Sequence, residues 1–196
     1  MHSDEIREAW DAEAAQFDDQ PDHGLRDPAV RKVWGTLLRQ HLPAAPARIA
    51  DLGCGTGTLS VLMAEHGHDV DGVDLSPKMI TRARAKARDL PLTFAEGDAS
   101  APDLPAAFYD VVLCRHVLWA LLEPVVVLRR WVDLLRPAGR LVLVEGSWST
   151  GAGLRADECV ELLASAGRSA DVIPLRESTY WGREISDERY LVVSQS

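Results

Sequence analysis

The sequence is poor in the features that mark secreted, metal-binding and membrane proteins. It has only three cysteines in 196 residues, Cys54, Cys114 and Cys159, with no C-x-x-C pair among them. Few, unpaired cysteines favour a reducing compartment over a disulfide framework and disfavour a zinc site. No run approaches the roughly 18 apolar residues of a membrane span, and the acidic first residues lack the apolar core of a signal peptide. We therefore expect a cytoplasmic protein without a metal and without a membrane partner.

Basic residues are also scarce. The chain has 21 Lys and Arg against 30 Asp and Glu, which gives a formal net charge of −9 at pH 7. Because clustered cations bind the phosphates of nucleic acids, this balance argues against a nucleic-acid partner. Four basic residues between positions 82 and 88 alternate along an expected helix and predict a solvated face. The length suits one domain, and no internal repeat interrupts it.

A glycine-rich turn is the most informative motif that the sequence does contain. Residues 51–57 read Asp-Leu-Gly-Cys-Gly-Thr-Gly, between an apolar run and a segment with helical spacing. Alternate glycines let a small molecule lie against bare backbone, and Asp51 at the strand end can receive its positive group. A dinucleotide-binding turn has the spacing G-x-G-x-x-G, but Thr58 occupies the position of the last glycine. The turn therefore departs from the NAD-binding type.

Two more carboxylates follow expected strands. Residues 69–74 alternate as a strand that ends at Asp74, about 20 residues past the turn, where a doubly wound sheet places an acid against a ribose. A strand over 92–95 leads to Asp98. Such strands share one edge of a parallel sheet, so the carboxylates of Asp51, Asp74 and Asp98 are expected in one site. A helix cap at Asp74 and an Asx turn at Asp98 are the plain structural alternatives.

These motifs, in this order, resemble those of the class I S-adenosylmethionine-dependent methyltransferases over residues 47 to 194. The resemblance implies an α/β doubly wound, mostly parallel seven-stranded sheet whose last strand is antiparallel. It departs from the family at Ala138, in a turn that usually has two glycines. It also implies S-adenosylmethionine as cofactor, with S-adenosylhomocysteine as product. The cofactor-binding residues that it implies are Asp51, Gly53, Cys54, Gly55, Asp74, Leu75, Met79, Asp98, Ala99 and Arg115.

We divide the chain into an N-terminal helical cap, residues 1–46, and a methyltransferase domain, residues 47–196, within a single domain overall. One helix is expected through Ile6, Trp10 and Phe17, and another begins at Asp27-Pro28. Residues 18–26 between them are too polar and broken to predict an element. In the proteins that the chain resembles, such a segment folds over the cofactor and shapes the acceptor pocket. A plain surface linker is the alternative.

The methyl acceptor is expected at the tip that follows a buried strand over residues 109–114. This tip, residues 115–119, differs from the Asn-Pro-Pro-Tyr form found in the family where amino groups of nucleic acids or glutamine side chains are methylated. His116 and His23 are candidate catalytic bases, although a histidine at the tip can equally orient the cofactor. Aromatic residues in the segments around the tip predict a small, partly apolar or aromatic acceptor. They are Trp10, Phe17, Trp119, Trp148, Tyr180 and Trp181.

The expected function is transfer of a methyl group to an O, N, S or C nucleophile of a small molecule, in small-molecule or secondary metabolism. Two alternatives stay open. One is an NAD-dependent oxidoreductase, which the glycine spacing disfavours. The other is a catalytically silent partner protein that binds S-adenosylmethionine. We expect a monomer or a homodimer.

Overall fold

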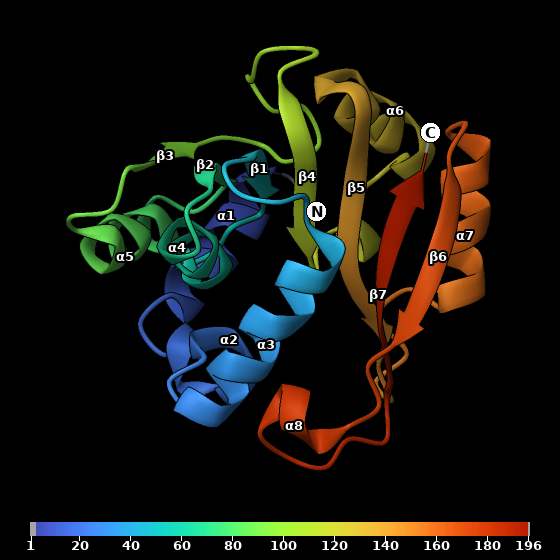
Figure 1. Cartoon of the computed structure of the whole chain (residues 1–196). Helices are drawn as coiled ribbons and strands as arrows, with labels where there is room; N and C mark the ends of the chain where they lie inside the picture. The colour runs from blue at the N-terminus through green and yellow to red at the C-terminus, as the bar shows by residue number, and fades with distance from the viewer. Residues whose placement is uncertain (1–2, 196) are drawn as a thin grey trace.

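One seven-stranded sheet organises the computed structural model, which describes residues 3–195 (Figure 1). The strand order is β3-β2-β1-β4-β5-β7-β6, and β7 runs antiparallel to both of its neighbours. The other neighbouring strands pair in parallel, which confirms the predicted sheet. The strands are β1 (Arg48–Leu52), β2 (Asp69–Asp74), β3 (Leu92–Glu96), β4 (Tyr109–Arg115), β5 (Leu135–Ser147), β6 (Ser169–Pro174) and β7 (Glu188–Gln195).

Helices cover both faces of the sheet (Figure 1). Along β4, Val111 and Leu113 pack with α3 and α4, whereas Val112 and Cys114 pack with α6 and α7. This alternation is the period-two pattern of a strand that is buried on both sides. The helical elements are α1 (Ser3–Glu13), η1 (Phe17–Asp19), α2 (Pro21–Gly24), α3 (Pro28–His41), α4 (Thr58–Glu65), α5 (Pro77–Ala87), η2 (Leu118–Ala120), α6 (Pro124–Leu134), α7 (Ala156–Ser165) and α8 (Ser178–Trp181).

Two helix starts follow the sequence signals. The Asp27 side chain accepts a hydrogen bond from the Ala29 amide at 2.8 Å and begins α3, which has Pro28 at its first position. The Ser76 hydroxyl likewise accepts from the Met79 amide at 3.1 Å and begins α5. Asp74 is therefore not the cap of α5.

The prediction that residues 18–26 form no regular element is wrong, because η1 and α2 occupy most of that segment. Pro21 starts α2, and Leu25, in the left-handed region at φ 46°, ends it. Asp18 and Asp22, which look like solvated loop residues, are buried. Their partners come from distant elements, so local polarity gives no sign of them.

The prediction that the basic residues between positions 82 and 88, on α5 and just after it, form a solvated face is also wrong in part. The Lys86 ammonium donates to Thr58 at 2.7 Å, to Thr56 at 3.0 Å and to Asp18 at 3.1 Å, so it is tied to three side chains. Arg84 donates to the Phe94 carbonyl at 2.7 Å. These two cations therefore join elements of the fold.

The expected turn over residues 136–139 lies inside β5 as a bulge. The pairing with β4 passes from Tyr109 opposite Leu135 to Val111 opposite Arg140, so β5 has extra residues at this point. Ala138 takes the left-handed conformation, φ 65°, at the position where the sequence departs from the family's two glycines.

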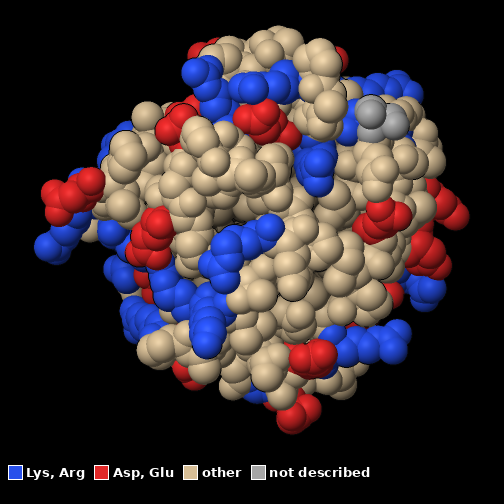
Figure 2. All heavy atoms as spheres, viewed as in Figure 1, with Lys and Arg blue, Asp and Glu red and all other residues tan. Residues whose placement is uncertain are grey.

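Charges of both signs mix on the surface viewed in Figure 2, so the net charge of −9 does not gather there in one acidic patch. No helix within residues 3–195 is long and apolar enough to cross a membrane.

Candidate active site

The glycine turn between β1 and α4 has three residues in the left-handed region, with φ values of 72° at Gly53, 56° at Gly55 and 73° at Gly57. A Cβ atom at Gly53 would lie 2.4 Å from the Val117 side chain, and one at Gly57 would lie 2.6 Å from the Phe94 ring. At Gly55 the contacts of such an atom, 3.3 and 3.7 Å, are both with the Phe17 ring. The open side of Gly55 is thus covered by the N-terminal segment.

Asp74 joins the end of β2 to this turn. One carboxylate oxygen accepts a hydrogen bond from the Gly55 amide at 2.8 Å, and the other accepts from the Ser76 amide at 2.9 Å. Burial raises the pKa of Asp74 above its ordinary value. The structure therefore brings together two of the predicted cofactor residues, the carboxylate and the bare backbone of the turn.

Asp51 lies at the end of β1 beside the turn and is buried. The Ser60 hydroxyl donates to its carboxylate at 2.5 Å. Burial raises the Asp51 pKa to about 6, although the hydrogen bond from Ser60 and the charge of Arg115 act in the opposite direction. Burial likewise raises the pKa of the Cys54 thiol, so the side chain is a neutral thiol at pH 7.

The other predicted cofactor residues differ in their exposure to solvent. Asp98 is exposed and forms an Asx turn, in which its carboxylate accepts from the Ser100 amide at 2.8 Å. Leu75 is half-buried, whereas Met79 and Ala99 are buried. Contacts of these four residues with a cofactor remain predictions.

Arg115 contacts the N-terminal segment. Its guanidinium donates to the Asp22 carbonyl at 2.6 Å and lies over the Trp34 ring, 5.5 Å from the centroid. The residue therefore fastens α2 to the end of β4. Its predicted cofactor contact would have to be made alongside these bonds and stays a prediction.

Two further carboxylates fasten the N-terminal segment over the site. Asp11 on α1 accepts from the Ser76 hydroxyl at 2.5 Å and from the Lys78 amide at 3.1 Å. Asp18 accepts from the Thr56 hydroxyl at 2.5 Å and from Lys86. These contacts favour a covering segment over a surface linker.

Both candidate bases belong to one group of rings, which we call the His–Trp cluster: His23, His116, Trp148 and Trp181. The His116 ring lies 5.3 Å from the Trp148 ring, edge to face, and is stacked on Trp181 at 6.1 Å. The two imidazoles share the same charged neighbours, because Arg115 and Arg189 each lower the pKa of both His116 and His23. His23 itself is stacked on Phe17 at 4.3 Å.

The two histidines are half-buried, and each has one buried ring nitrogen without a partner within residues 3–195. His23 Nδ1 and His116 Nε2 have no hydrogen-bond partner among the described residues. Burial lowers both pKa values, that of His116 strongly, and the guanidinium of Arg115 lowers them further. Both rings are therefore neutral at pH 7. His116 takes φ 57°, in the left-handed region that is uncommon outside glycine and that recurs at functional sites.

Asp22, His23 and His116 also have the composition of a metal site. Their ligand atoms lie within 4.8 Å of one another. Arg189 lies against the same group, with Nη1 3.8 Å from the Asp22 carboxylate, and the charge of Arg115 acts on both imidazoles. Two guanidinium charges oppose the binding of a divalent cation. The arrangement suits a small polar ligand better than a metal.

Of the predicted aromatic residues, Phe17, Trp148 and Trp181 gather at the cluster. Trp119 is 37% exposed, and its ring lies 5.5 Å from that of Trp148. Trp10 is 41% exposed but reaches Phe17 at 6.4 Å. Tyr180 packs against Trp34 in the core. The predicted group of aromatic residues around the acceptor is therefore present in part.

Sequence reasoning missed two buried charged residues beside the cluster. Arg189, which is 5% exposed, lies over Trp181 and Trp148, with its Cζ atom 4.8 and 5.4 Å from their centroids. Glu145, which is 0% exposed, accepts from the amides of Val117 and Leu118 at 3.1 and 2.8 Å. Burial raises the Glu145 pKa to about 8. In the sequence, each of these charged residues stands next to a run of apolar strand residues, and that position was the signal that could have revealed them.

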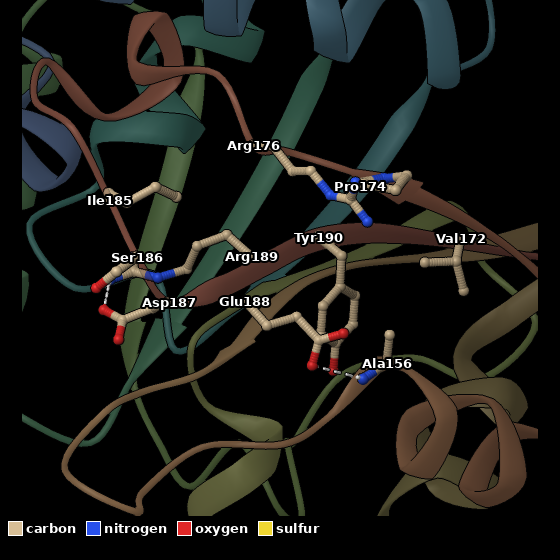
Figure 3. A pocket seen from close by; sticks show the side chains of 10 residues that line it. All are labelled: Ala156, Val172, Pro174, Arg176, Ile185, Ser186, Asp187, Glu188, Arg189 and Tyr190. Carbon is tan, nitrogen blue, oxygen red and sulfur yellow. Dashed lines mark hydrogen bonds and ion pairs between the residues drawn. The ribbon is translucent and has the colours of Figure 1, made fainter.

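A cavity of about 430 Å³ has Arg189 among its lining residues (Figure 3). Side chains of β6, β7 and the segment before β7 line it, together with Ala156 at the start of α7. The Ala156 amide donates to the Glu188 carboxylate at 3.4 Å. The cavity does not include the histidines. It has the size of a small-ligand pocket next to the site.

Fold and site together define a class. Residues 50–143 match the methyltransferase domain family, and this match together with the fold supports a class I S-adenosylmethionine-dependent methyltransferase. Among curated proteins the chain is similar to the ubiquinone biosynthesis O-methyltransferase of Xanthomonas euvesicatoria pv. vesicatoria. The two are 32% identical over 137 residues, which are 68% of this chain and 54% of the relative. The chain thus spans about half the length of the curated relatives it matches.

Two solved structures share the fold. An S-adenosylmethionine-dependent methyltransferase from Mesorhizobium loti has a TM-score of 0.68 and 22% identity, over 82% of this chain and 96% of that one. The [4+2]-cyclase SpnF has a TM-score of 0.73 and 17% identity, over 84% and 80% of the two chains. Because a cyclase has the same fold, the reaction must be argued from the site.

Proposed function

We propose that this protein transfers a methyl group from S-adenosylmethionine to a small molecule, with oxygen as the favoured nucleophile. The observation that carries the proposal is the pair formed by Asp74 and Gly55, a carboxylate at the end of β2 bonded to the bare turn after β1. The His–Trp cluster follows β4 in the same sheet, so a ligand bound at the turn would have an acceptor site beside it. The name of the Xanthomonas relative supports oxygen.

The residues present fit this cofactor. Among the described residues, the Phe17 ring alone lies within 4 Å of a Cβ atom added at Gly55, and Asp74 offers a carboxylate suited to two ribose hydroxyls. We assign the adenine amino group to Asp98, which is exposed beyond β3. Asp51 and Arg115 would border the methionine part. When bound, S-adenosylmethionine supplies a methyl group already activated by its sulfonium.

The protein's own contribution is then to orient and to exclude water. Alignment of two reactants can account for about 7–11 kcal/mol of a barrier. The N-terminal segment, fastened through Asp11 and Asp18, would enclose the acceptor. We assign to His116 the role of accepting the acceptor's proton at Nε2, with His23 as the second candidate.

The finer features of the proposal are a cytoplasmic location, a monomeric or homodimeric state and an acceptor that is not a nucleic acid. The acidic composition and the scarcity of cysteine support the location and the exclusion of nucleic acid. Sedimentation and size-exclusion measurements on the purified chain would decide between monomer and homodimer.

Calorimetric titration tests the cofactor. We expect S-adenosylhomocysteine to bind and NAD not to bind. Binding of NAD without S-adenosylhomocysteine would overturn the proposal in favour of the oxidoreductase alternative. Incubation with a labelled methyl donor and a library of phenols, amines and thiols then separates an active enzyme from a silent binding protein.

A further inference from the structure

We propose that Arg189 binds the methyl acceptor and holds its hydroxyl oxygen as an anion beside His116, so that the acceptor is a small molecule with an acidic hydroxyl, a phenol or an enol. This inference rests on the proposed methyl transfer. It adds the residue that selects the acceptor and the ionisation state in which the acceptor is bound.

The position of Arg189 supports this role. The two indole rings that flank its guanidinium, Trp148 and Trp181, are the same two that contact the His116 ring. Arg189 is the second residue of β7, the antiparallel strand, so it lies at the edge of the sheet where the parallel strands end. A buried cation therefore stands at the ligand-binding edge, next to a neutral imidazole.

Two of the three guanidinium nitrogens of Arg189 lie near carboxylates, and the third is unpaired in the described chain. Nη2 lies 3.3 Å from the Asp187 carboxylate, and Nη1 lies 3.8 Å from that of Asp22. The buried Nε has no hydrogen-bond partner in the part of the chain that the structure describes. A Cβ atom at Gly146 would lie 2.7 Å from Cδ and 3.4 Å from Nε of Arg189, so the absence of a side chain at this glycine lets the arginine pack against the backbone of β5. An unpaired buried donor of this kind calls for an acceptor atom.

The chemistry of the three unpaired nitrogens defines the ligand. Arg189 Nε only donates, whereas His23 Nδ1 and His116 Nε2 belong to neutral rings that can accept a proton. An oxygen that starts as a hydroxyl and becomes an anion satisfies both kinds of group. Because burial, and then the charges of the guanidiniums, hold the imidazole pKa values down, the histidines are weak bases, and the hydroxyl must itself be acidified.

Other nucleophiles fit less well. A protonated amine would meet two guanidinium charges, Arg115 and Arg189, without gaining a partner for Nε. An aliphatic alcohol ionises too weakly for a weak base. A thiol ionises readily, but its sulfur accepts hydrogen bonds poorly. A phenol or an enol combines an acidic hydroxyl with a planar, weakly polar body that suits the aromatic side chains of the cluster.

The transfer step balances as follows. The hydroxyl proton passes to His116 Nε2, and Arg189 stabilises the oxyanion left behind. An oxygen lone pair forms the new bond to the methyl carbon while the carbon–sulfur bond breaks and its electron pair stays on sulfur. The products are the methyl ether and S-adenosylhomocysteine, and His116 returns the proton to solvent.

Nitrophenols give a direct test, because their phenolate form absorbs visible light. We would titrate 4-nitrophenol and 4-nitrocatechol into the full chain saturated with S-adenosylhomocysteine, at several pH values. We expect the pKa of the bound probe to fall by about one unit or more, which is a tenfold preference for the anion. The Arg189→Gln variant should lose most of this shift, and Arg189→Lys, which keeps the charge, should retain part of it.

Arg183→Gln is the matched control, because Arg183 is an exposed arginine in the same segment and its loss removes one charge equally. It should leave the probe's pKa shift unchanged. If wild-type protein saturated with S-adenosylhomocysteine binds no nitrophenol, or binds it without a pKa shift, the inference is wrong while the methyltransferase proposal stands. An equal shift in Arg189→Gln would also overturn it. Failure of S-adenosylhomocysteine to bind wild-type protein would instead overturn the proposed function. If Arg189→Gln does not fold, the wild-type shift and Arg189→Lys still decide.

Discussion

At the scale of single residues, the site depends on carboxylates that bind backbone amides. Asp74 holds the Gly55 amide and Glu145 holds the amides after His116, so each acid fixes a loop that a ligand would touch. An ionised carboxylate that accepts hydrogen bonds from amides makes charge-assisted bonds, which are stronger than neutral ones. Glu145, with a pKa of about 8, is mostly protonated at pH 7 and makes neutral bonds instead. Substitution of Asp74 should therefore change binding more than its size alone suggests.

Asp74→Ala should weaken S-adenosylhomocysteine binding by about 1.5–3 kcal/mol, because a charge-assisted hydrogen bond to the ligand is lost and the Gly55 amide loses its partner. Calorimetry measures the change. Asp69→Ala is the control, because Asp69 is exposed at the opposite end of the same strand. An unchanged dissociation constant for Asp74→Ala would remove this residue from the site.

Gly55→Val should abolish cofactor binding, because a branched side chain would fill the space over the turn. The residue also has φ 56°, so some loss of stability is expected from backbone strain, about 1–3 kcal/mol. Gly151→Val separates the two effects. Gly151 has φ 84°, and no described atom lies within 4 Å of the added Cβ, so that variant has strain without a blocked site. Normal S-adenosylhomocysteine binding by folded Gly55→Val would show that the turn is not the site.

Glu145 should make the stability of the protein depend on pH. Its folded-state pKa of about 8 lies above the ordinary value of 4.5, so the folded state retains a proton that the unfolded state releases. Its favourable contribution is complete below pH 4.5 and is lost as the pH rises to about 8. Glu145→Gln should flatten this fall. Urea unfolding at pH 5, 7 and 9 measures the free energy of unfolding, and an equally steep fall in the variant would contradict the prediction.

At the scale of elements, the N-terminal segment is held to the sheet by specific side chains. Asp18 connects η1 to the turn residue Thr56 and to Lys86 on α5, and Arg115 connects the end of β4 to α2. Opening this segment for cofactor exchange requires these bonds to break. The rate at which S-adenosylhomocysteine dissociates should therefore report on the Asp18 contact.

Asp18→Ala should speed the dissociation of S-adenosylhomocysteine and lower the free energy of unfolding by about 1–3 kcal/mol, because Lys86 and Thr56 lose a buried partner. Stopped-flow displacement measures the rate. Asp19→Ala is the neighbouring control, since Asp19 is an exposed acid that bonds to Arg26. Equal dissociation rates in the two variants would mean that the segment is not held through Asp18.

At the scale of the whole molecule, sequence patterns predicted individual strands and the glycine turn because these depend on local periodicity, whereas the seven-stranded sheet with its antiparallel last strand was implied by the family resemblance. Alternating residues predicted β2 at its observed bounds, and the capping residue Asp27 marked the start of α3. The sequence did not reveal the partners of Asp18, Lys86 and Arg189, because these contacts join positions tens of residues apart. The acceptor side of the site consists mostly of such contacts, which is why it was predicted least well.

The reversed strand β7 also has a consequence for how the chain is made. It lies between β5 and β6, so β6 has no strand to pair with in this sheet until residues 188–195 have left the ribosome. Arg189 arrives in the same stretch, whereas Asp22, against which it lies, is synthesised near the beginning. During synthesis the first five strands can pair while the acceptor side is still incomplete. A nascent chain should therefore gain the ability to hold the cofactor before it gains the ability to select an acceptor.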